Sequence, residues 1–489
     1  MTRQRNAAHG RSAAAGLVLA GIVAAAPAGG LAQTAAESEV TFAGDIAPLL
    51  QQHCQTCHRE GSMAPMPLVT YAETRPWARA IKNRVLAREM PPWHLDKTVG
   101  IQQFINDISL SDEQIDLVAR WVDAGAPLGN PRDMPPPATW PDDDRFRLEA
   151  ELGPPDIVVQ SVPWTMPAES QDVWFTPVVE IDLPESVWVR AAETKPSREG
   201  RQIAHHGSTY LYQPKSPELL AAERALRSGE GTVDDVIRAA TGQEYSENLQ
   251  EVREFFTEWA QGKDGEIFPD NVGKLVHAGA KVEFEVHYHA VGREVTDVME
   301  CAWWLYPKDS PPKYNAQFAA VGITAGQLLE IPPHSVTETK GTYVMPAPGL
   351  FHNFQPHMHF RGKAFLMEAI YPSGRREVLN YTSQFDNTWH LNYIYDPDYA
   401  PLLPKGTVVE ITAWHDNTAA NRNNPDPRQW VAYGQRTVDD MAHANQQVIF
   451  ITQEDYDRLS AEREARAAPA PQRRADSASD PSARRAPPR

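Results

Sequence analysis

The sequence predicts a multidomain protein: a small all-α domain is followed by two all-β sandwich domains, and the first of these carries a helical insertion. Three observations predict this order. The chain has 489 residues, which is more than one ordinary domain. Apolar residues recur at helical spacing up to about residue 130. Beyond residue 155, short runs of Val, Ile, Trp, Tyr and Phe alternate with Pro, Gly and Asn, which is typical of strands and turns.

Residues 1–33 predict a signal peptide for export. Arg3, Arg5 and Arg11 precede an apolar run over 13–26, and small residues follow up to residue 33. The apolar run is shorter than the roughly 20 residues that a membrane-spanning helix needs. We therefore expect a periplasmic or secreted protein without stable membrane insertion.

The charge balance is acidic. The chain has 46 Lys+Arg and 64 Asp+Glu, for a net charge of -18. Duplex nucleic acid needs a basic surface, so nucleic acid is excluded as a partner. An acidic surface instead favours a basic soluble partner through electrostatic steering.

A compact helical domain is predicted over residues 34–130. Apolar residues follow helical spacing up to the first cysteine. A second helix is expected near Thr74, with Pro76 in its first turn. A third is expected from Ser111, where Gln114 completes a capping box.

The helical domain contains the segment Cys54-Gln55-Thr56-Cys57-His58. This spacing is typical of covalent haem c attachment, in which both cysteines form thioethers and His58 binds the iron. Zinc is the alternative, but it needs two further ligands and Cys301 is the only other cysteine. We expect one haem c here, and we expect Cys301 to be a buried, inert thiol on a strand.

A distal haem ligand is expected within the same domain. Met90 opens Met90-Pro91-Pro92-Trp93, which resembles the methionine loop of small class I cytochromes c. Met63, Met66 and His94 are the alternatives, and the first two are expected to line the haem pocket. A methionine ligand favours ferrous iron and raises the reduction potential.

The remaining domain boundaries follow from composition. Residues 131–155 are rich in proline and acids and predict a semi-rigid linker. The two β domains are expected at 156–315 and 316–455. A helix-favouring stretch over 217–261 predicts an insertion in the first of them, and residues 456–489 predict a disordered tail.

Histidines cluster in three places in the β region. His205 and His206 are adjacent, so they can share a metal only if the strand twists or bulges there. His287 lies in an alternating strand pattern, and His357 and His359 are spaced to project from the same face of a strand. Three imidazoles suit zinc and copper equally.

Taken in order, these motifs resemble the type II copper monooxygenases, the family of peptidylglycine alpha-hydroxylating and dopamine beta-monooxygenases. The resemblance covers about 300 residues, from Asp156 to Thr452, and implies two jelly-roll-like copper domains. It implies one copper at His205, His206 and His287. It implies a second, catalytic copper at His357, His359 and the methionine of Asp439-Asp440-Met441. Two imidazoles and a thioether favour copper over zinc, which makes Met441 the discriminating residue.

The resemblance implies that one atom of O2 enters an aliphatic C–H bond of a small organic substrate. Two further electrons are required, and we expect the fused haem to deliver them to the first copper. Two other functions stay open. One is a haem and copper protein for electron transfer or copper binding without oxygenase activity. The other is a dehydrogenase that exports electrons through the haem. A soluble redox protein is expected as a partner.

Two features depart from the family. The animal enzymes are braced by disulfides, whereas the β region here contains only Cys301. The insertion over 217–261 has no counterpart, and the residues that would bind substrate cannot be assigned. Five further histidines of this region are expected to be core or supporting residues: His289, His334, His352, His390 and His415.

Overall fold

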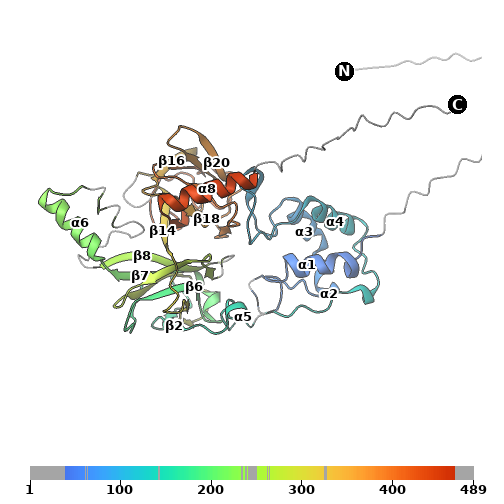
Figure 1. Ribbon diagram of the computed structural model, residues 1–489. Helices are drawn as coiled ribbons and strands as arrows, with labels where there is room; N and C mark the ends of the chain where they lie inside the picture. Colours follow the sequence, from blue (N-terminus) through green and yellow to red (C-terminus); the bar gives the residue numbers. More distant parts are fainter. Residues whose placement is uncertain are drawn as a thin grey trace, which may run out of the picture. The chain divides into compact units, whose positions relative to one another are not determined.

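The computed structural model describes most of the chain from residue 39 to residue 467 (Figure 1). The described residues are 39–60, 62, 64–140, 142, 144–232, 235–236, 239, 251–260, 263, 265–323 and 328–467. The predicted signal peptide therefore lies outside them. Residues from Val40 onward belong to one compact unit. Within the described residues, no helix combines the length and apolar character needed to cross a membrane.

Short helices form the N-terminal region, and the predicted capping box is confirmed. Ser111 caps the third of the expected helices and accepts a hydrogen bond from the Gln114 amide, while the Gln114 side chain accepts one from the Ser111 amide. Trp121 and Phe42 are fully buried in the core of this region. The helices are α1 (Ala47–His53), α2 (Tyr71–Thr74), α3 (Ala78–Leu86) and α4 (Asp112–Asp123).

Between α3 and α4 the chain leaves the helical region and joins a β-sheet. Strand β1 (Leu95–Gly100) pairs antiparallel with β20 (Arg376–Thr382). Trp93, just before β1, packs edge-on against Tyr393 with ring centroids 4.7 Å apart. The prediction of a helical domain over all of 34–130 is therefore wrong for this stretch. Burial of the Trp93 side chain in the β core stabilises its position there by about 2–3 kcal/mol.

The first β region consists of two sheets around a shared apolar core. One sheet has the order β4-β11-β7-β8, and the other begins β2-β13-β6-β10. Leu211, Phe284 and Trp303 are fully buried between them. The strands are β2 (Ile157–Gln160), β3 (Trp164–Met166), β4 (Val173–Phe175), β5 (Val178–Glu180), β6 (Val187–Lys195), β7 (Ala204–Pro214), β8 (Glu251–Ala260), β9 (Glu266–Ile267), β10 (Val272–Val276), β11 (Lys281–Tyr288), β12 (Val295–Asp297) and β13 (Glu300–Leu305).

The second β region has the same construction. The sheet β1-β20-β19-β23-β16 faces a sheet that contains β14, β25, β17 and β22. Phe354, Phe365 and Ile411 are buried between them. The remaining strands are β14 (Tyr314–Ile323), β15 (Glu330–Ile331), β16 (Val336–Val344), β17 (Gly349–Phe351), β18 (Asn353–His357), β19 (Gly362–Ile370), β21 (Tyr393–Ile394), β22 (Leu402–Leu403), β23 (Val408–Asp416), β24 (Val431–Ala432) and β25 (Ala442–Phe450).

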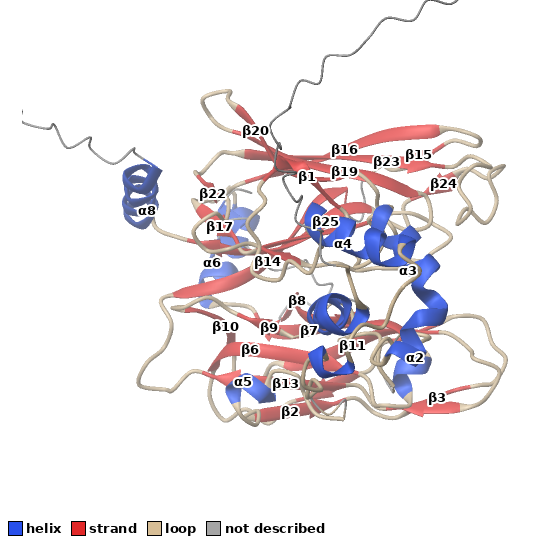
Figure 2. Ribbon diagram, turned by 90° about the vertical axis from the view of Figure 1, so that its right-hand side faces the viewer, coloured by secondary structure: helices blue, strands red, loops and turns tan. Residues whose placement is uncertain are grey.

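One sheet runs through both β regions. Strand β10 of the first region pairs in parallel with β14 of the second, and β14 pairs antiparallel with β25. The result is an eleven-stranded sheet (Figure 2). Continuous backbone hydrogen bonding therefore joins the two regions that carry the histidine motifs.

The predicted helical insertion over 217–261 is wrong over Glu251–Ala260, which form a strand. Helix α6 covers only Pro217–Ser228, and β8 then pairs with β7 along its length. The Glu and Arg residues of β8 favour a helix, but Phe255 and Phe256 are buried in the strand. Packing of these aromatic side chains overrides the local preference. Residues 233–234, 237–238 and 240–250 lie outside the described part.

The linker and the tail are also partly ordered. A short helix, α5 (Glu149–Leu152), ends at Gly153, whose carbonyl accepts a hydrogen bond from Trp304 Nε1 at 2.8 Å. The predicted disordered tail begins inside helix α8 (Gln453–Ala467). Tyr456 and Leu459 pack this helix against the β region. Two apolar residues in so polar a stretch do not form a visible helical periodicity. Residues 468–489 lie outside the described part.

Candidate metal centre

A bulge in β7 turns two adjacent histidines towards the same place. In the β11–β7 ladder His287 faces His206, and Tyr288 faces Ala204. His205 is therefore the extra residue on its strand, at a register shift. This confirms the local distortion that a shared site for His205 and His206 requires.

His287 completes the set from β11, and two residues hold its ring. His287 Nε2 lies 2.9 Å from Asp172 Oδ2, at hydrogen-bond distance. Trp174 stacks on the imidazole at 4.6 Å with an interplanar angle of 6°. A carboxylate on one ring nitrogen fixes the orientation of the ring and is a common support for a metal-binding histidine.

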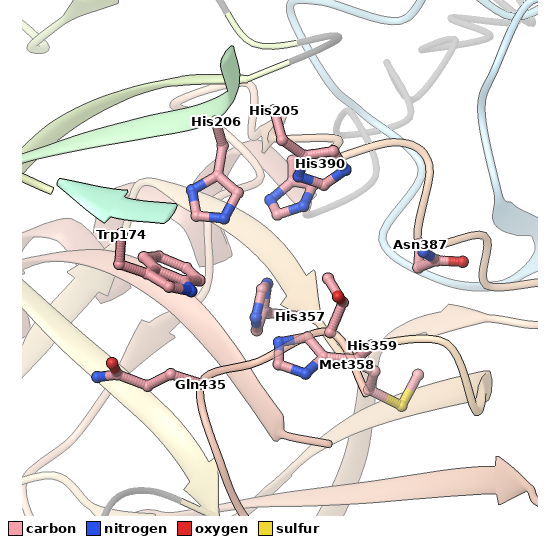
Figure 3. Close-up of a pocket in the computed structure, with 10 residues that line it drawn as sticks. Trp174, His205, His206, His357, Met358, His359, Asn387, His390 and Gln435 are labelled. Carbon is pink, nitrogen blue, oxygen red and sulfur yellow. The ribbon is translucent and has the colours of Figure 1, made fainter. Parts of the chain in front are cut away.

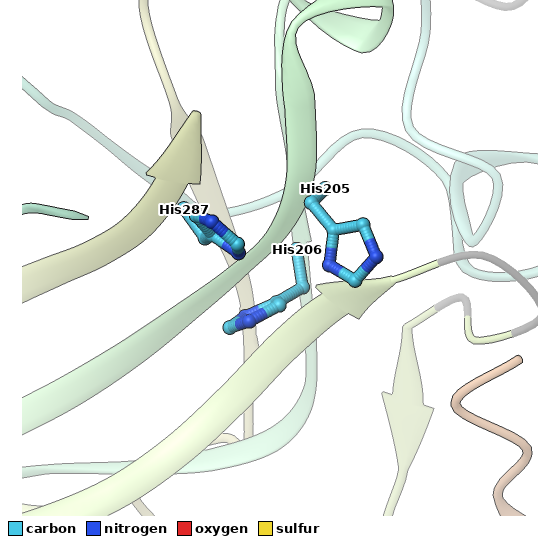
Figure 4. Close-up of side chains that lie close together, drawn as sticks. All are labelled: His205, His206 and His287. Atoms are coloured by element: carbon cyan, nitrogen blue, oxygen red, sulfur yellow. The ribbon is translucent and has the colours of Figure 1, made fainter. Parts of the chain in front are cut away.

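The three imidazoles have the spacing of a metal site (Figure 4). One ligand atom from each lies within 4.8 Å of the others. The ring centroids of His205, His206 and His287 are 5.3–5.5 Å apart. A nitrogen about 2.0–2.1 Å from an ion places two tetrahedrally arranged ring centres about 5 Å apart. Nδ1 of His205 and Nδ1 of His287 are buried without a hydrogen-bond partner, as expected of atoms that could bind an ion.

A second set forms where β18 meets β25. His357 pairs with His443 across the ladder, and their ring centroids are 5.0 Å apart. His359 lies 5.2 Å from His357 by the same measure. His443 was not among the ligands predicted from the sequence. Its position two residues after Met441, at strand spacing, is the signal that could have found it.

Asp440 anchors this second set. Its Oδ1 accepts hydrogen bonds from the amides of His359 and Met441, both at 2.9 Å, so the two backbones lie close together. Burial favours a raised pKa for Asp440, but the contacts with His415 and the His359 amide outweigh it and lower the pKa. Met441 is 9% exposed. Asp440 holds the Met441 backbone beside that of His359, and ligation by the Met441 thioether stays a prediction.

The two sets meet at one small cavity (Figure 3). The cavity has a volume of about 10 Å³, which is room for one water-sized occupant. Both His206 and His357 line it, as does His390, which was expected to be a core or supporting residue. No sequence signal surrounds His390, so only the fold brings it here. The full cluster is His205, His206, His287, His357, His359, His390 and His443.

Desolvation keeps these imidazoles neutral. It lowers the pKa of His205 to about 3 and that of His443 to about 4, with further lowering from neighbouring histidines. The pKa values of His206 and His357 are lowered well below 6.5 for the same two reasons. Neutral imidazole is the form that binds metals, so the cluster needs no deprotonation at neutral pH.

The ring of His352 is similarly desolvated, but we expect this residue to affect only the stability of the fold and not metal binding. Desolvation lowers its pKa from 6.5 to about 4, so the stability that neutral His352 contributes is present above pH 6.5 and is lost as the pH falls towards 4. The variant His352→Gln lacks this titrating group. Between pH 7 and pH 4 its free energy of unfolding should therefore fall by about 2 kcal/mol less than that of the wild type, after allowance for partial exposure. Urea unfolding of both metal-free proteins at each pH measures this, and parallel stability curves would contradict it.

The cysteine motif follows α1, and one ring nitrogen of His58 is held by a backbone carbonyl. His58 Nδ1 donates a hydrogen bond to the Met66 carbonyl oxygen at 3.0 Å, because a carbonyl can only accept. This leaves Nε2 available for iron. The Met66 side chain and Cys54 pack against the helical core, so Met66 suits a lining role. These residues fit haem c attachment.

The candidates for the distal haem ligand lie in different surroundings. Met90 lies half-buried after α3, and Met63 is outside the described part. His94 follows Trp93, and its backbone amide donates to Tyr393 Oη at 3.2 Å. Met90 stays the predicted ligand.

Cys301 is a core residue, as expected. It is fully buried on β13, where Trp303 Nε1 donates to its sulfur at 3.2 Å. Burial raises the pKa of its thiol. A protonated, enclosed thiol is a poor nucleophile and a poor metal ligand.

No protein-family model matches this chain, and no curated protein matches it. A solved structure of a xanthan lyase from Paenibacillus is 10% identical, with a TM-score of 0.16. The similarity covers 65% of this chain and 28% of the lyase. A likeness this weak carries no argument, so the site is interpreted from its own geometry.

Proposed function

We propose that this protein is an exported copper monooxygenase that inserts one atom of O2 into an aliphatic C–H bond of a small organic substrate. The proposal depends on one observation: His205 and His206 of the first β region and His357 and His359 of the second line the same cavity. The order and spacing of the motifs resemble the type II copper monooxygenases, with jelly-roll-like copper domains. That resemblance, and a thioether at Met441, favour copper over zinc.

The reaction requires an outside source of electrons. O2 accepts four electrons when one atom becomes an alcohol and the other becomes water, and the C–H bond supplies two. Bound copper would supply the one-electron chemistry that the other two electrons need. The chain's own part is to hold neutral imidazoles, with Asp172 orienting His287 and Asp440 anchoring the backbone of His359.

We further propose that a haem c attached to Cys54 and Cys57, with His58 as proximal and Met90 as distal ligand, delivers these electrons. The supporting observation is the path of the chain after Met90. Trp93 packs against Tyr393, which lies three residues from His390. The segment that follows the haem-binding region therefore contacts the segment that carries a histidine of the cluster.

Substitution of both motif cysteines tests the haem assignment. In Cys54→Ser/Cys57→Ser we expect loss of the haem absorption band and a fall of about tenfold or more in substrate-dependent O2 uptake, because electron supply is cut. Copper content, measured by elemental analysis, should stay at about two per chain. Cys301→Ala is the matched control and should keep its haem.

The same measurements separate the other two functions. A protein that binds haem and copper but consumes no O2 with any substrate would be an electron-transfer or copper-binding protein. Reduction of the haem by substrate in the absence of O2 would show a dehydrogenase. Either result would contradict the proposed monooxygenase.

A further inference from the structure

His390 lies between the two histidine sets and contacts both. It belongs to the loop between β20 and β21. Its ring centroid is 5.3 Å from that of His206 and 6.0 Å from that of His205, in the first β region. It is also 5.3 Å from that of His357, in the second. These separations are near the roughly 5 Å expected for two imidazoles on one ion.

The surroundings of His390 are polar and enclosed, which suits a cation. Glu258, whose side chain is 5% exposed, comes from the first β region and interacts electrostatically with the His390 ring. The cavity beside the ring has a volume of about 10 Å³, which is room for one water-sized occupant. Apolar packing alone would not require three further imidazoles within 6.0 Å of this side chain.

We propose that His390 is a metal ligand at the junction of the two sets, and that the chain therefore holds two ions side by side in one continuous histidine cluster. The proposal rests on the proposed function for the identity of the metal as copper. It goes beyond that function because it assigns a ligand that neither motif contains, and because it predicts close approach of the ions.

Magnetic resonance of the copper-loaded protein tests the arrangement without measuring activity. The full exported chain is loaded with Cu(II) alone, and its copper content is measured by elemental analysis. We expect two coppers per chain. We also expect either a half-field transition or a spin count well below the copper content, since both require two neighbouring Cu(II) ions.

The variant His390→Ala tests the assigned ligand. We expect the affinity for one of the two coppers to fall by about 100-fold, and the coupling to disappear. His352→Ala is the matched control, because its ring is similarly desolvated but its electrostatic neighbour is Glu266 and not a histidine of the cluster. It should bind and couple both coppers as the wild type does.

The remaining outcomes are distinct. Two magnetically isolated coppers, both unaffected by His390→Ala, would overturn this inference and leave the proposed function standing. Coupled coppers in a protein that consumes no O2 would support the inference and contradict the monooxygenase. A chain that binds no copper would overturn both.

Discussion

Replacement of Lys263 by methionine should destabilise the protein by about 3–5 kcal/mol. Lys263 Nζ lies 2.8 Å from Glu266 and 3.4 Å from Glu258, and the three side chains are 3–5% exposed. Without the Lys263 ammonium group, the carboxylates of Glu258 and Glu266 would stay buried but would lose the positive charge that balances them. The lost stability is therefore the cost of leaving them uncompensated.

The same network joins the two β regions next to the histidine cluster. Lys263 Nζ also donates to Gln355 Oε1 at 3.2 Å, and Gln447 Nε2 donates to Glu266 Oε2 at 3.3 Å. Both glutamines belong to the second region. We therefore expect Lys263→Met to loosen the approach of the two histidine sets as well as to lower the free energy of unfolding.

Urea unfolding of the metal-free proteins measures the effect. Lys308→Met is the matched control, because Lys308 pairs with Glu185 on the surface and its side chain is 80% exposed. Its unfolding free energy should change by less than about 0.5 kcal/mol. A triple variant, Glu258→Gln with Lys263→Met and Glu266→Gln, should recover much of the loss, since it leaves no buried charge unpaired. A Lys263→Met protein as stable as Lys308→Met would show that the network contributes little.

Replacement of His357 and His359 together by alanine should abolish the oxygenase reaction, with a fall of about 1000-fold or more in product formation. The two rings are 5.2 Å apart, and alanine leaves neither nitrogen for a metal. Copper content should fall from two to about one per chain, while the haem absorption band is retained. Product analysis and elemental analysis on the same sample measure both effects.

Two comparisons make this result specific. His352→Ala removes a desolvated imidazole outside the cluster and should keep both coppers. Met441→Ala should also lose one copper, because its thioether is a proposed ligand. Retention of both coppers would contradict that assignment and favour His443 and His390 as the ligands. If the double variant of His357 and His359 retained two coppers and full activity, these histidines would not be ligands of a catalytic copper.

Features encoded over a few residues were predictable from the sequence. The capping box at Ser111 needs only a hydroxyl and an amide three residues apart, and it forms as expected. The need for a bulge at His205 followed from the fact that adjacent strand residues point to opposite faces. The β-rich character beyond residue 155 followed from composition in the same way.

Where local preference competed with packing, prediction failed. The stretch that ends in β8 has helix-favouring residues, yet Phe255 and Phe256 are buried as a strand beside β7. Tyr456 likewise packs α8 against the β region, although the tail shows no apolar periodicity. Burial of an aromatic side chain contributes more than the few tenths of a kcal/mol by which local preferences differ.

The sequence by itself determined which residues could bind metals: the Cys54 motif, the adjacent pair at His205 and the alternating pair at His357. Tertiary structure alone decided that His390 and His443 join them, and that Lys263 links the two β regions beside them. Spacing along a strand or helix depends only on residues that are close together in the sequence. Proximity between residue 206 and residue 390 depends on sheet pairing over the whole chain, and no short pattern carries that information.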